Sequence, residues 1–391
     1  MANRRKVLVG MSGGVDSSLS AALLLEQGYD VIGAFMKNWS GSTKVCDETE
    51  EFQECDWRTE RRDAMRVAAQ LGIPFLTFDF EREYREKVVD YMVREYAVGR
   101  TPNPDVMCNK FMKFDLFMRE ADKLGCDFVA TGHYARIEES PVFIGSRCRL
   151  ATAKVLLAGV DVNKDQSYFL CQMPREVLPR VLFPVGGMLK SQVREEAKKR
   201  GLVVADKKDS QGVCFIGEFN MTEFLQDYIE KKPGKIVDTN GKEVGDHQGL
   251  PFYTIGQREG LEIGGLKTPY YVVGKNAERN EIIVSSNFHE ALYRTELTAS
   301  EMNWLVEPVF ASEAKQSNDQ EIASSAGSLL AKTIKCQARI RYRQPLEKCA
   351  VDLLEDRRLH VTFDKLQRAV TPGQFIVLYD SDVVLGGAVI E

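Results

Sequence analysis

A short stretch near the N-terminus has the residues of a phosphate-binding loop. Residues 10–18 read Gly-Met-Ser-Gly-Gly-Val-Asp-Ser-Ser, between the apolar run 7–9 and a helical pattern over 19–27. A glycine-rich turn between a strand and a helix presents backbone N–H groups to an anion, and the helix dipole favours the negative charge. The central glycines let the backbone approach the anion without a Cβ in the way. The carboxylate of Asp16 can hold a magnesium ion that accompanies the phosphates.

The spacing of this loop excludes two common nucleotide-binding motifs. No Gly-Lys-Ser/Thr follows, so it is not a Walker A loop, and it is not G-x-G-x-x-G either. The order S-G-G-x-D-S resembles the pyrophosphate loop (PP-loop) of the ATP-pyrophosphatase superfamily, whose members split ATP between its α and β phosphates and adenylate a substrate oxygen. The alternative is a plain Ser/Gly turn, which the strand–turn–helix context disfavours.

Two cysteines have surroundings that favour chemistry. Cys108 follows the proline-rich stretch 99–107 and precedes a predicted helix, whose N-terminus would favour the nucleophilic thiolate. Asp105 is a candidate proton acceptor or N-cap, and Cys214 lies in a polar, glycine-containing loop. The usual alternative for a cysteine is a small buried apolar residue. We apply it to the cysteines in apolar or strand-like settings: Cys126, Cys148, Cys171, Cys336 and Cys349.

The nine cysteines contain no C-x-x-C pair, which argues against a zinc ribbon or a secreted disulfide framework. Cys46 and Cys55 flank an acidic loop and are interpreted as surface thiols. We expect no metal site built by protein ligands alone.

The elements that position these residues alternate between strand and helix over the first 215 or so residues. Strands are predicted at 30–36, 74–80 and 127–130, and helices at 57–71, 81–96, 110–124 and 190–200. This alternation predicts a parallel sheet covered by helices on both faces, that is, a doubly wound α/β fold. His133 follows a strand end, where open α/β sheets bind ligands, although a lone histidine fits a structural role equally well.

The pattern changes after residue 215. A helix is predicted over 218–232, hairpin turns at 240–241 and 276–280, and short strands from about 297 onward, which indicate a small β-barrel. Residues 311–327 are rich in Ser, Ala, Gln and Glu, which is typical of a mobile surface loop. We therefore expect three domains: 1–217, catalytic; 218–294, a central α+β domain; and 295–391, a C-terminal β-barrel.

Charge and hydropathy limit the partners. The formal net charge is −5, so a nucleic acid would have to meet a local basic surface. Arg339, Arg341 and Arg343 alternate with apolar or aromatic residues, which on a strand would place three guanidinium groups on one face. A solvated strand face is the alternative. No apolar run approaches the roughly 20 residues that span a bilayer, and the first predicted strand leaves no room for a leader, so we expect a cytosolic protein.

Several further motifs occur in a fixed order along the chain. Together with S-G-G-V-D-S they resemble the tRNA-specific 2-thiouridylase family, which makes 2-thiouridine at the wobble position of tRNA. The motifs are Phe-Met-Lys-Asn-Trp at 35–39, Thr-Pro-Asn-Pro-Asp at 101–105 with Cys108-Asn109, Thr-Gly-His-Tyr at 131–134, Lys-Asp-Gln-Ser-Tyr-Phe-Leu at 164–170, Cys-Phe-Ile-Gly at 214–217, Gly-Gln-Arg at 256–258, Arg-Tyr-Arg-Gln at 341–344 and Thr-Pro-Gly-Gln at 371–374. The resemblance covers nearly the whole chain.

The resemblance implies an adenine-nucleotide hydrolase-like (HUP, PP-loop) catalytic domain that uses ATP and Mg²⁺. It implies that ATP is held by Gly10, Met11, Ser12, Gly13, Gly14, Val15, Asp16, Ser17, Met36 and Gly132. It implies that Asn103, Pro104 and Asp105 meet the target base. It further implies contacts with tRNA from Lys164, Asp165, Gln166, Arg341 and Tyr342.

The resemblance also implies the sulfur chemistry of a tRNA sulfurtransferase. Cys214 would carry a persulfide received from a sulfur-relay protein or a cysteine desulfurase. Cys108 would release the sulfur and form a disulfide with Cys214, with Asp105 beside it in the catalytic set. The substrates would be the tRNAs for Lys, Glu and Gln, with no membrane involved. Two departures from the family pattern are the acidic loop between Cys46 and Cys55 and the insertion at 311–327.

Three other functions remain as alternatives. An amidotransferase-coupled synthetase would need a glutaminase cysteine, but residue 2 is Ala and no glutaminase-like region precedes the loop. A lysidine or 4-thiouridine synthetase would share the loop but not the surroundings of both Cys108 and Cys214. A non-catalytic nucleotide sensor would need neither cysteine.

Overall fold

The computed structural model describes residues 4–40, 56–141, 152–209, 221–261, 263, 268–286, 290–306 and 333–391. The chain divides into two compact units. The first contains residues 1–98, 102–138 and 154–231, and the second contains 99–101, 139–153 and 232–391.

A parallel sheet forms the centre of the first unit. Its strands are β1 (Lys6–Gly10), β2 (Asp30–Lys37), β3 (Phe75–Asp79), β4 (Phe128–Ala130) and β7 (Val181–Leu182), in the order β3-β2-β1-β4-β7 within the described chain. β1 pairs with β2 and with β4, so the carboxyl ends of these three strands share one edge. The predicted doubly wound parallel sheet is confirmed.

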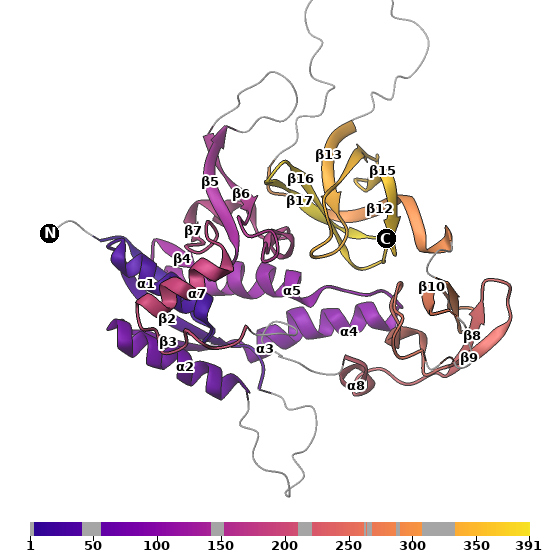
Figure 1. Ribbon diagram of the computed structural model, residues 1–391, viewed down its shortest axis with the longest axis horizontal. Coiled ribbons are helices and arrows are strands. Elements are labelled where there is room, and N and C mark those ends of the chain that lie inside the picture. The colour runs from indigo at the N-terminus through magenta and orange to yellow at the C-terminus, as the bar shows by residue number, and fades with distance from the viewer. Residues whose placement is uncertain are drawn as a thin grey trace, which may run out of the picture. The chain divides into compact units, whose positions relative to one another are not determined.

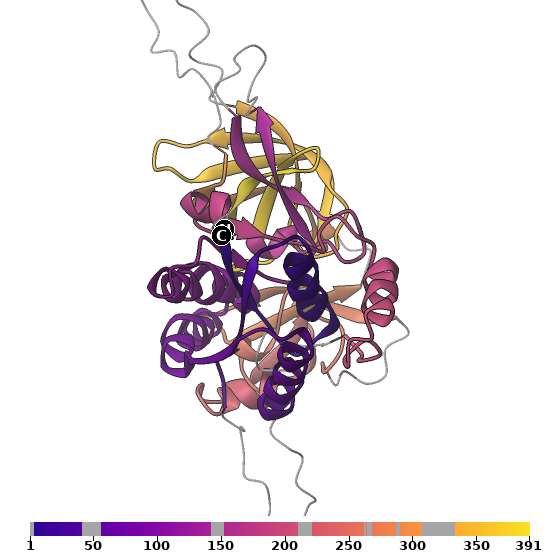
Figure 2. The same ribbon diagram turned by 90° about the vertical axis from the view of Figure 1, so that its left-hand side faces the viewer.

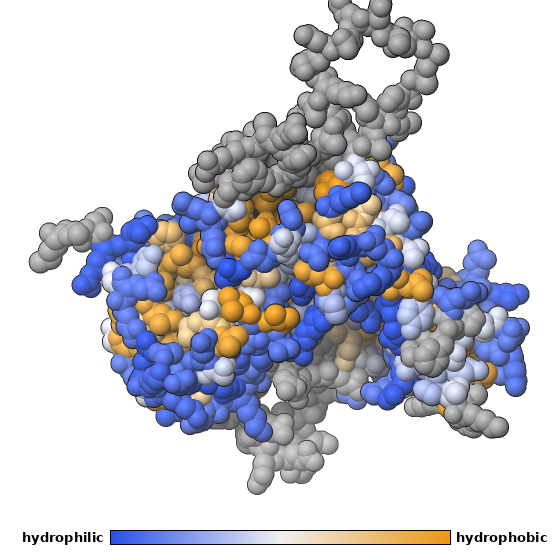
Figure 3. Space-filling model, turned by 45° about the horizontal axis from the view of Figure 1, so that its top comes forward, coloured by the Kyte–Doolittle hydropathy of each residue, from blue (hydrophilic) through white to orange (hydrophobic). Residues whose placement is uncertain are grey.

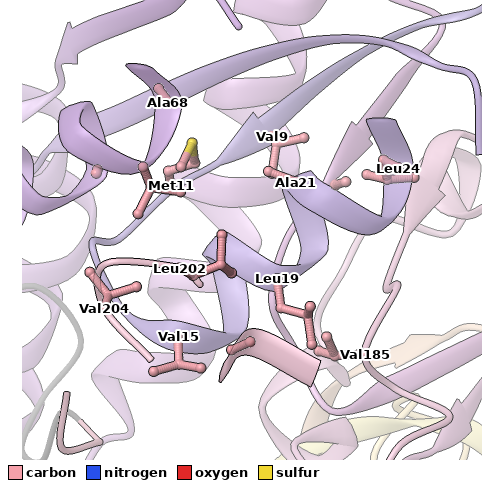
Figure 4. Packing of buried hydrophobic residues seen from close by; sticks show 14 of the residues in the cluster. Val9, Met11, Val15, Leu19, Ala21, Leu24, Ala68, Val185, Leu202 and Val204 are labelled. Atoms are coloured by element: carbon pink, nitrogen blue, oxygen red, sulfur yellow. The ribbon is translucent and has the colours of Figure 1, made fainter. Parts of the chain in front are cut away.

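Helices cover both faces of this sheet (Figures 1 and 2). Buried residues of α1 (Val15–Glu26), α2 (Asp56–Leu71) and α7 (Lys190–Lys199) form one apolar core with the sheet. Figure 4 shows part of this core, labelling Val9, Met11, Val15, Leu19, Ala21, Leu24, Ala68, Val185, Leu202 and Val204. On the other face Phe117 contacts Phe78 of β3, with a ring-centroid distance of 6.0 Å.

Two helical segments follow β3 along the chain. The first joins α3 (Glu81–Tyr84) to α4 (Asp90–Ala97) through a π-helical stretch, Arg85–Val89. The second joins α5 (Pro104–Met107) to α6 (Phe117–Lys123) through another π-helical stretch, Cys108–Leu116. The predicted start of this second helix, residue 110, is wrong. Asn103 caps the helix by accepting a hydrogen bond from the Val106 N–H at 3.3 Å, and Pro104 supplies a first turn that needs no N–H donor.

The first unit also contains less regular elements. They are β5 (Ala135–Pro141) and β6 (Thr152–Ala158), whose outer residues 139–153 group with the second unit, the 3₁₀ turns Ser167–Leu170 and Arg175–Arg180, and α8 (Met221–Gln226). The helix predicted over 218–232 is shorter in the structure: α8 ends at Gln226, and a turn follows in which the N–H groups of Tyr228 and Ile229 both donate to the Leu225 carbonyl.

The second unit contains two β-structures. A four-stranded sheet, ordered β10-β11-β8-β9, is made of β8 (Gly234–Asp238), β9 (Glu243–His247), β10 (Tyr270–Asn276) and β11 (Glu281–Ser286). The predicted hairpin turns join β8 to β9 and β10 to β11. Positive φ angles at Gly241 and Asn280 allow these tight turns.

The predicted β-barrel is confirmed in the described part of the C-terminal region. Its strands are β12 (Tyr293–Trp304), β13 (Thr333–Arg339), β14 (Glu347–Leu353), β15 (Leu359–Arg368), β16 (Phe375–Asp380) and β17 (Val383–Ile390). They follow the order β12-β15-β14-β13-β16-β17, and pairing of β12 with β17 closes the ring. Closure removes the exposed edges that a flat sheet would have.

The prediction that one strand carries three arginines on one face is wrong. β13 ends at Arg339, and residues 341–343 form a turn in which the Gln344 N–H donates to the Arg341 carbonyl and Arg343 has a φ of +63°. Arg339 is buried over the ring of Tyr379, and only Arg343 is exposed. The three guanidinium groups therefore do not form one face.

The face drawn in Figure 3 is mainly hydrophilic, with apolar residues in small groups. Within the described part of the chain, every helix is too short or too polar to cross a membrane.

Candidate active site

The loop after β1 has the geometry of a tight anion cradle. Gly13 has a φ of +76°, and a Cβ there would lie 2.3 Å from the carbonyl oxygen of Glu60, so the position accepts only glycine. The Ser17 hydroxyl accepts a hydrogen bond from the Ser12 N–H at 3.2 Å, and the Ser18 hydroxyl donates to the Gly14 carbonyl at 2.8 Å. These bonds hold the loop closed against the start of α1.

The N-terminus of α1 is available to an anion. Gly14 is its N-cap residue, with extended backbone and no side-chain capping bond. The first N–H groups of a helix have no partner within the helix, and they carry the positive end of its dipole. The sequence-predicted phosphate cradle therefore has the donors it needs, at the carboxyl edge of β1.

Two other predicted nucleotide-site residues meet this loop. A Cβ on Gly132, just after β4, would lie 2.6 Å from the Ser17 amide nitrogen, so glycine is what allows this close approach. Met36 of β2 lies close to Gly10 at the end of β1, since a Cβ added to Gly10 would lie 3.2 Å from the Met36 Cε.

Lys190 adds a cation to the loop, and sequence reasoning missed it. Its Nζ lies 2.6 Å from Asp16 Oδ1 and 2.9 Å from Asp209 Oδ1, and its side chain is 12% exposed. Tyr134 donates to the same Asp16 oxygen at 2.7 Å. Burial, together with the charge of Asp16, raises the pKa of Tyr134 far above its usual value, so the hydroxyl stays a donor.

Asp209 joins further cations to this cluster. Lys164 and Arg194 each lie 2.6 Å from one of its carboxylate oxygens. Burial alone would raise the pKa of Asp209, but hydrogen bonds from Lys164 and Lys190 outweigh it and hold that pKa at about 2. Asp161 belongs to the same cluster, because its carboxylate accepts the Lys190 backbone N–H at 2.9 Å. Acidic and basic side chains are therefore interleaved beside the phosphate cradle.

His133 is buried next to a lysine. Its Nδ1 lies 2.7 Å from the Thr131 hydroxyl, and its Nε2 lies 3.3 Å from Lys113 Nζ. Burial and the nearby Lys113 charge lower the pKa of His133 well below its usual value. The ring is therefore neutral near pH 7 and can accept a hydrogen bond, which favours a positioning role over acid catalysis.

Cys108 is fully buried where α5 passes into its π-helical stretch. It lies in the second turn rather than before the first, so the dipole effect expected at a helix N-terminus is weaker than the sequence suggested. Asp105 is in the first turn. The neighbouring Asn109 donates to the Phe169 carbonyl at 3.1 Å, while its buried Oδ1 has no hydrogen-bond partner in the described part of the chain. Cys214, Cys46, Cys55 and Cys148 lie outside the described residues.

The side-chain amide of Asn38, beyond the end of β2, is 1% exposed, and neither its oxygen nor its nitrogen has a hydrogen-bond partner among the residues that the structure describes. An unsatisfied buried amide is rare because it costs about 1–3 kcal/mol. Its donor and acceptor match the edge of a nucleobase.

Comparison with known proteins identifies the family. Three family models match successive parts of the chain: "tRNA methyl transferase HUP domain" over residues 5–218, "tRNA methyl transferase PRC-barrel domain" over 222–286 and "Aminomethyltransferase beta-barrel domain" over 294–390. The tRNA-specific 2-thiouridylase MnmA of Listeria monocytogenes is 48% identical over 387 residues, which cover 99% of this chain and 94% of that protein. The chain belongs to the tRNA-specific 2-thiouridylase family.

Other members of the 2-thiouridylase family are similarly close. The proteins of that name from Staphylococcus carnosus and Streptococcus mutans are 47% and 46% identical, covering 99% and 100% of this chain and 95% and 96% of theirs. Solved structures are more distant: a 4-thiouridine synthetase–RNA complex with bound ATP is 18% identical, covers 54% of this chain and 44% of that chain, and has a TM-score of 0.33.

Some residues predicted to contact tRNA also make hydrogen bonds or ion pairs within the first unit. Asp165 is buried, and its Oδ1 accepts the N–H groups of Gly159 and Ser167, both at 3.0 Å. Gln166 accepts the N–H of Tyr134 at 3.0 Å. Lys164 pairs with Asp209, as described above.

Arg341, another predicted tRNA contact, lies in the second unit. Its Nη2 is within 3.0 Å of the Ile255 and Ala369 carbonyls and 2.6 Å from the Thr371 hydroxyl. The neighbouring Tyr342 is half-buried beneath the guanidinium of Arg343. Whether these residues also meet tRNA stays a prediction.

Proposed function

We propose that this chain is an ATP-dependent tRNA 2-thiouridylase, which adenylates the 2-carbonyl of the wobble uracil and replaces that oxygen with sulfur. The observation that carries the proposal is the phosphate cradle at the start of α1, with Lys190 beside it, in a chain that aligns along 99% of its length with proteins of that name.

The site fits ATP as the co-substrate. The α1 N-terminus has free backbone donors for phosphate oxygens, and Asn38 has an unsatisfied amide for a nucleobase edge. ATP supplies an AMP group that turns the uracil oxygen into a good leaving group. Asp16 would hold Mg²⁺, because magnesium in such sites takes one or two carboxylates along with phosphate oxygens and water.

The cations beside the cradle act on the departing pyrophosphate. Asp209 holds the side chains of Lys190 and Lys164 in place. These side chains therefore need to move little when negative charge builds up on the pyrophosphate that leaves the α-phosphate. Preorganised charges of this kind contribute most where charge develops in the transition state. Gly132 keeps β4 close to the first turn of α1, which fixes the cradle relative to the sheet edge.

The sulfur step uses two cysteines. The terminal sulfur of a Cys214 persulfide attacks C2 of the adenylated uracil, and AMP leaves with the oxygen. The Cys108 thiolate then attacks the Cys214 sulfur, which breaks the S–S bond to the base and leaves 2-thiouridine. The cysteine pair is thereby oxidised to a disulfide, and an external thiol must reduce it before the next turnover.

The base must leave its stack to be modified. Asn103, Pro104 and Asp105 begin the helix that carries Cys108, so a base bound by them would lie near the attacking thiol. Asp105 is then the candidate acceptor for the thiol proton. The substrates would be the tRNAs for Lys, Glu and Gln, and the persulfide would come from a sulfur-relay protein or a cysteine desulfurase. We place the reaction in the cytoplasm, where thiols stay reduced.

The test is mass spectrometry of tRNA nucleosides after incubation with ATP, Mg²⁺ and a persulfide donor, namely a cysteine desulfurase with free cysteine as its sulfur source. We expect 2-thiouridine, AMP and pyrophosphate, with product formation lost in Asp16→Asn. Cys214→Ser should abolish persulfide formation, and Cys108→Ser should keep the persulfide but stall transfer. Cys126→Ser is the matched control, because Cys126 is buried before the opposite end of β4.

Three results would contradict the proposal. Formation of ADP and phosphate would exclude adenylation. A normal rate for Cys108→Ser, or a persulfide found only on Cys46 or Cys55, would overturn the cysteine assignment. Peptide mapping after one turnover without reductant should find the Cys108–Cys214 disulfide.

A further inference from the structure

Three residues just before the helix that carries Cys108 belong to the other compact unit. Residues 99–101 group with the second unit, although residues 1–98 and 102–138 on either side belong to the first. The chain therefore enters the second unit for one short segment and returns to the first at Pro102. Asn103, the N-cap of the helix, follows directly.

Hydrogen bonds hold this segment from both of its ends. Lys275 of β10 donates to the Gly99 carbonyl at 2.8 Å. The Thr101 N–H donates to the Pro372 carbonyl at 2.8 Å, and Gln374 donates to the Thr101 carbonyl at 2.9 Å. Both backbone groups of Thr101 are therefore bonded, the N–H to a backbone carbonyl and the carbonyl to the side-chain amide of Gln374.

The segment also packs closely against its neighbours in the second unit. Gly373 has a φ of +92°, and a Cβ there would lie 2.9 Å from the Thr101 N and O atoms, so the contact requires glycine. The hydroxyls of Thr101 and Thr254 lie 3.1 Å apart. Lys275 is partly buried, and this burial lowers the pKa of its ammonium group to about 8.

Arg341 connects the two sides of this contact. It bonds the Ile255 carbonyl, next to Thr254, and the Thr371 hydroxyl, next to Pro372. The Gly-Gln-Arg, Arg-Tyr-Arg-Gln and Thr-Pro-Gly-Gln sequences thus meet in one place.

We propose that Thr254, Lys275 and the 372–374 turn form a clamp on residues 99–101, which positions the base-binding loop and the Cys108 helix for sulfur transfer. The clamp residues are positioning residues: they act through the backbone of the loop. Pro102 has a fixed φ, so the backbone between Thr101 and the helix cap Asn103 has little conformational freedom. The inference rests on the proposed function and assigns a role to residues of the central sheet and the barrel.

The test compares Lys275→Met, Gln374→Leu and the milder Thr254→Val with Lys235→Met. Lys235 is the matched control because it is a half-exposed lysine on β8 of the same sheet. For each variant, thiolation kcat and the KM values for tRNA and ATP are measured, with urea unfolding as the check on folding. The alkylation rate of Cys108 by iodoacetamide is followed by mass spectrometry relative to that of Cys126.

We expect Lys275→Met and Gln374→Leu to lower kcat about 10- to 100-fold with KM values within about threefold, because a displacement near 1 Å is enough to lose a reactive geometry. Cys108 alkylation should rise several-fold, and Lys235→Met should change neither. Thr254→Val keeps the side-chain shape and should show the same changes to a smaller degree. If Lys275→Met and Gln374→Leu do not fold, the result for Thr254→Val decides the test.

Unchanged kcat and Cys108 alkylation in folded variants would overturn the clamp. A raised KM for tRNA at unchanged kcat would do so too, because it would make these residues RNA contacts instead. If wild-type enzyme fails to thiolate tRNA, the proposed function fails, but the alkylation rates still decide whether the clamp positions the Cys108 helix.

Discussion

Replacing Gly132 with alanine tests whether the close approach of β4 to the phosphate loop positions the reaction. The added Cβ would lie 2.6 Å from the Ser17 amide nitrogen and 2.7 Å from the Asp16 carbonyl carbon. Ordinary Cβ contacts begin at 3.4 Å, so one of the two segments must move by about 0.8 Å, the shortfall from that distance. Both obstructing atoms are backbone, so a side-chain rotation cannot relieve the clash.

The shift predicts a large loss of activity and a modest loss of stability. A misplacement near 1 Å can reduce a rate about 100-fold, so we expect kcat/KM for tRNA-dependent pyrophosphate release to fall about 30- to 100-fold. Overpacking of this size lowers the free energy of unfolding by about 1–3 kcal/mol.

The chain offers a matched control in Gly187→Ala. A Cβ on Gly187 would meet no heavy atom within 4 Å, and its φ is not in the left-handed region. Pyrophosphate release and urea unfolding are measured for both variants and the wild type. If Gly132→Ala is folded and within about threefold of Gly187→Ala, the reasoning about the close approach is refuted.

Three further outcomes follow from the charges. Lys190→Met should lower AMP formation about 100-fold or more, because it removes a preorganised cation; near-normal AMP formation would mean that Lys190 only neutralises Asp16 and Asp209. The folded pKa of Asp209, about 2, is below its unfolded value, so its stabilisation is present above about pH 4 and is lost as pH falls toward 2. Urea unfolding should therefore show Asp209→Asn about 1–2 kcal/mol less stable at pH 6, with the gap narrowing below pH 4; a constant gap would contradict this. The folded pKa of Lys275, about 8, is also below its unfolded value of about 10.4, so the folded state releases a proton first. Wild-type stability relative to Lys275→Met should thus rise between about pH 8 and 10.5, by up to about 3 kcal/mol, and a flat difference in urea unfolding would refute the burial argument.

Local features could be predicted because their causes lie within a few residues. The phosphate loop needs only a strand, glycines at two positions and a helix start, which residues 7–18 provide in order. Helices end near glycines with positive φ at Gly28, Gly72 and Gly201, as their spacing indicated. The main local error was the start of the Cys108 helix, where the prolines were interpreted as an extended loop although Pro104 begins the helix.

The pairing of charges could not be predicted in this way. Lys190 is 174 positions from Asp16, and the sequence identified it only as the start of a helix. One signal was available: a helix that begins after the last strand of a parallel sheet starts at the same edge as the phosphate loop. The identity of the partner depended on how α1 and α7 pack together.

The sequence by itself determined the phosphate loop, the alternation that makes the parallel sheet, and the strand-rich C-terminal region, because each depends on residue order along a short stretch. Tertiary structure decided which polar side chains hold the fold and which are left for a ligand. Asp165 is used internally, Asn38 is left unsatisfied, and Gln374 reaches the Thr101 carbonyl across 273 positions. A hydrogen bond requires two groups within about 3 Å, and that proximity is created by packing, which no local pattern records.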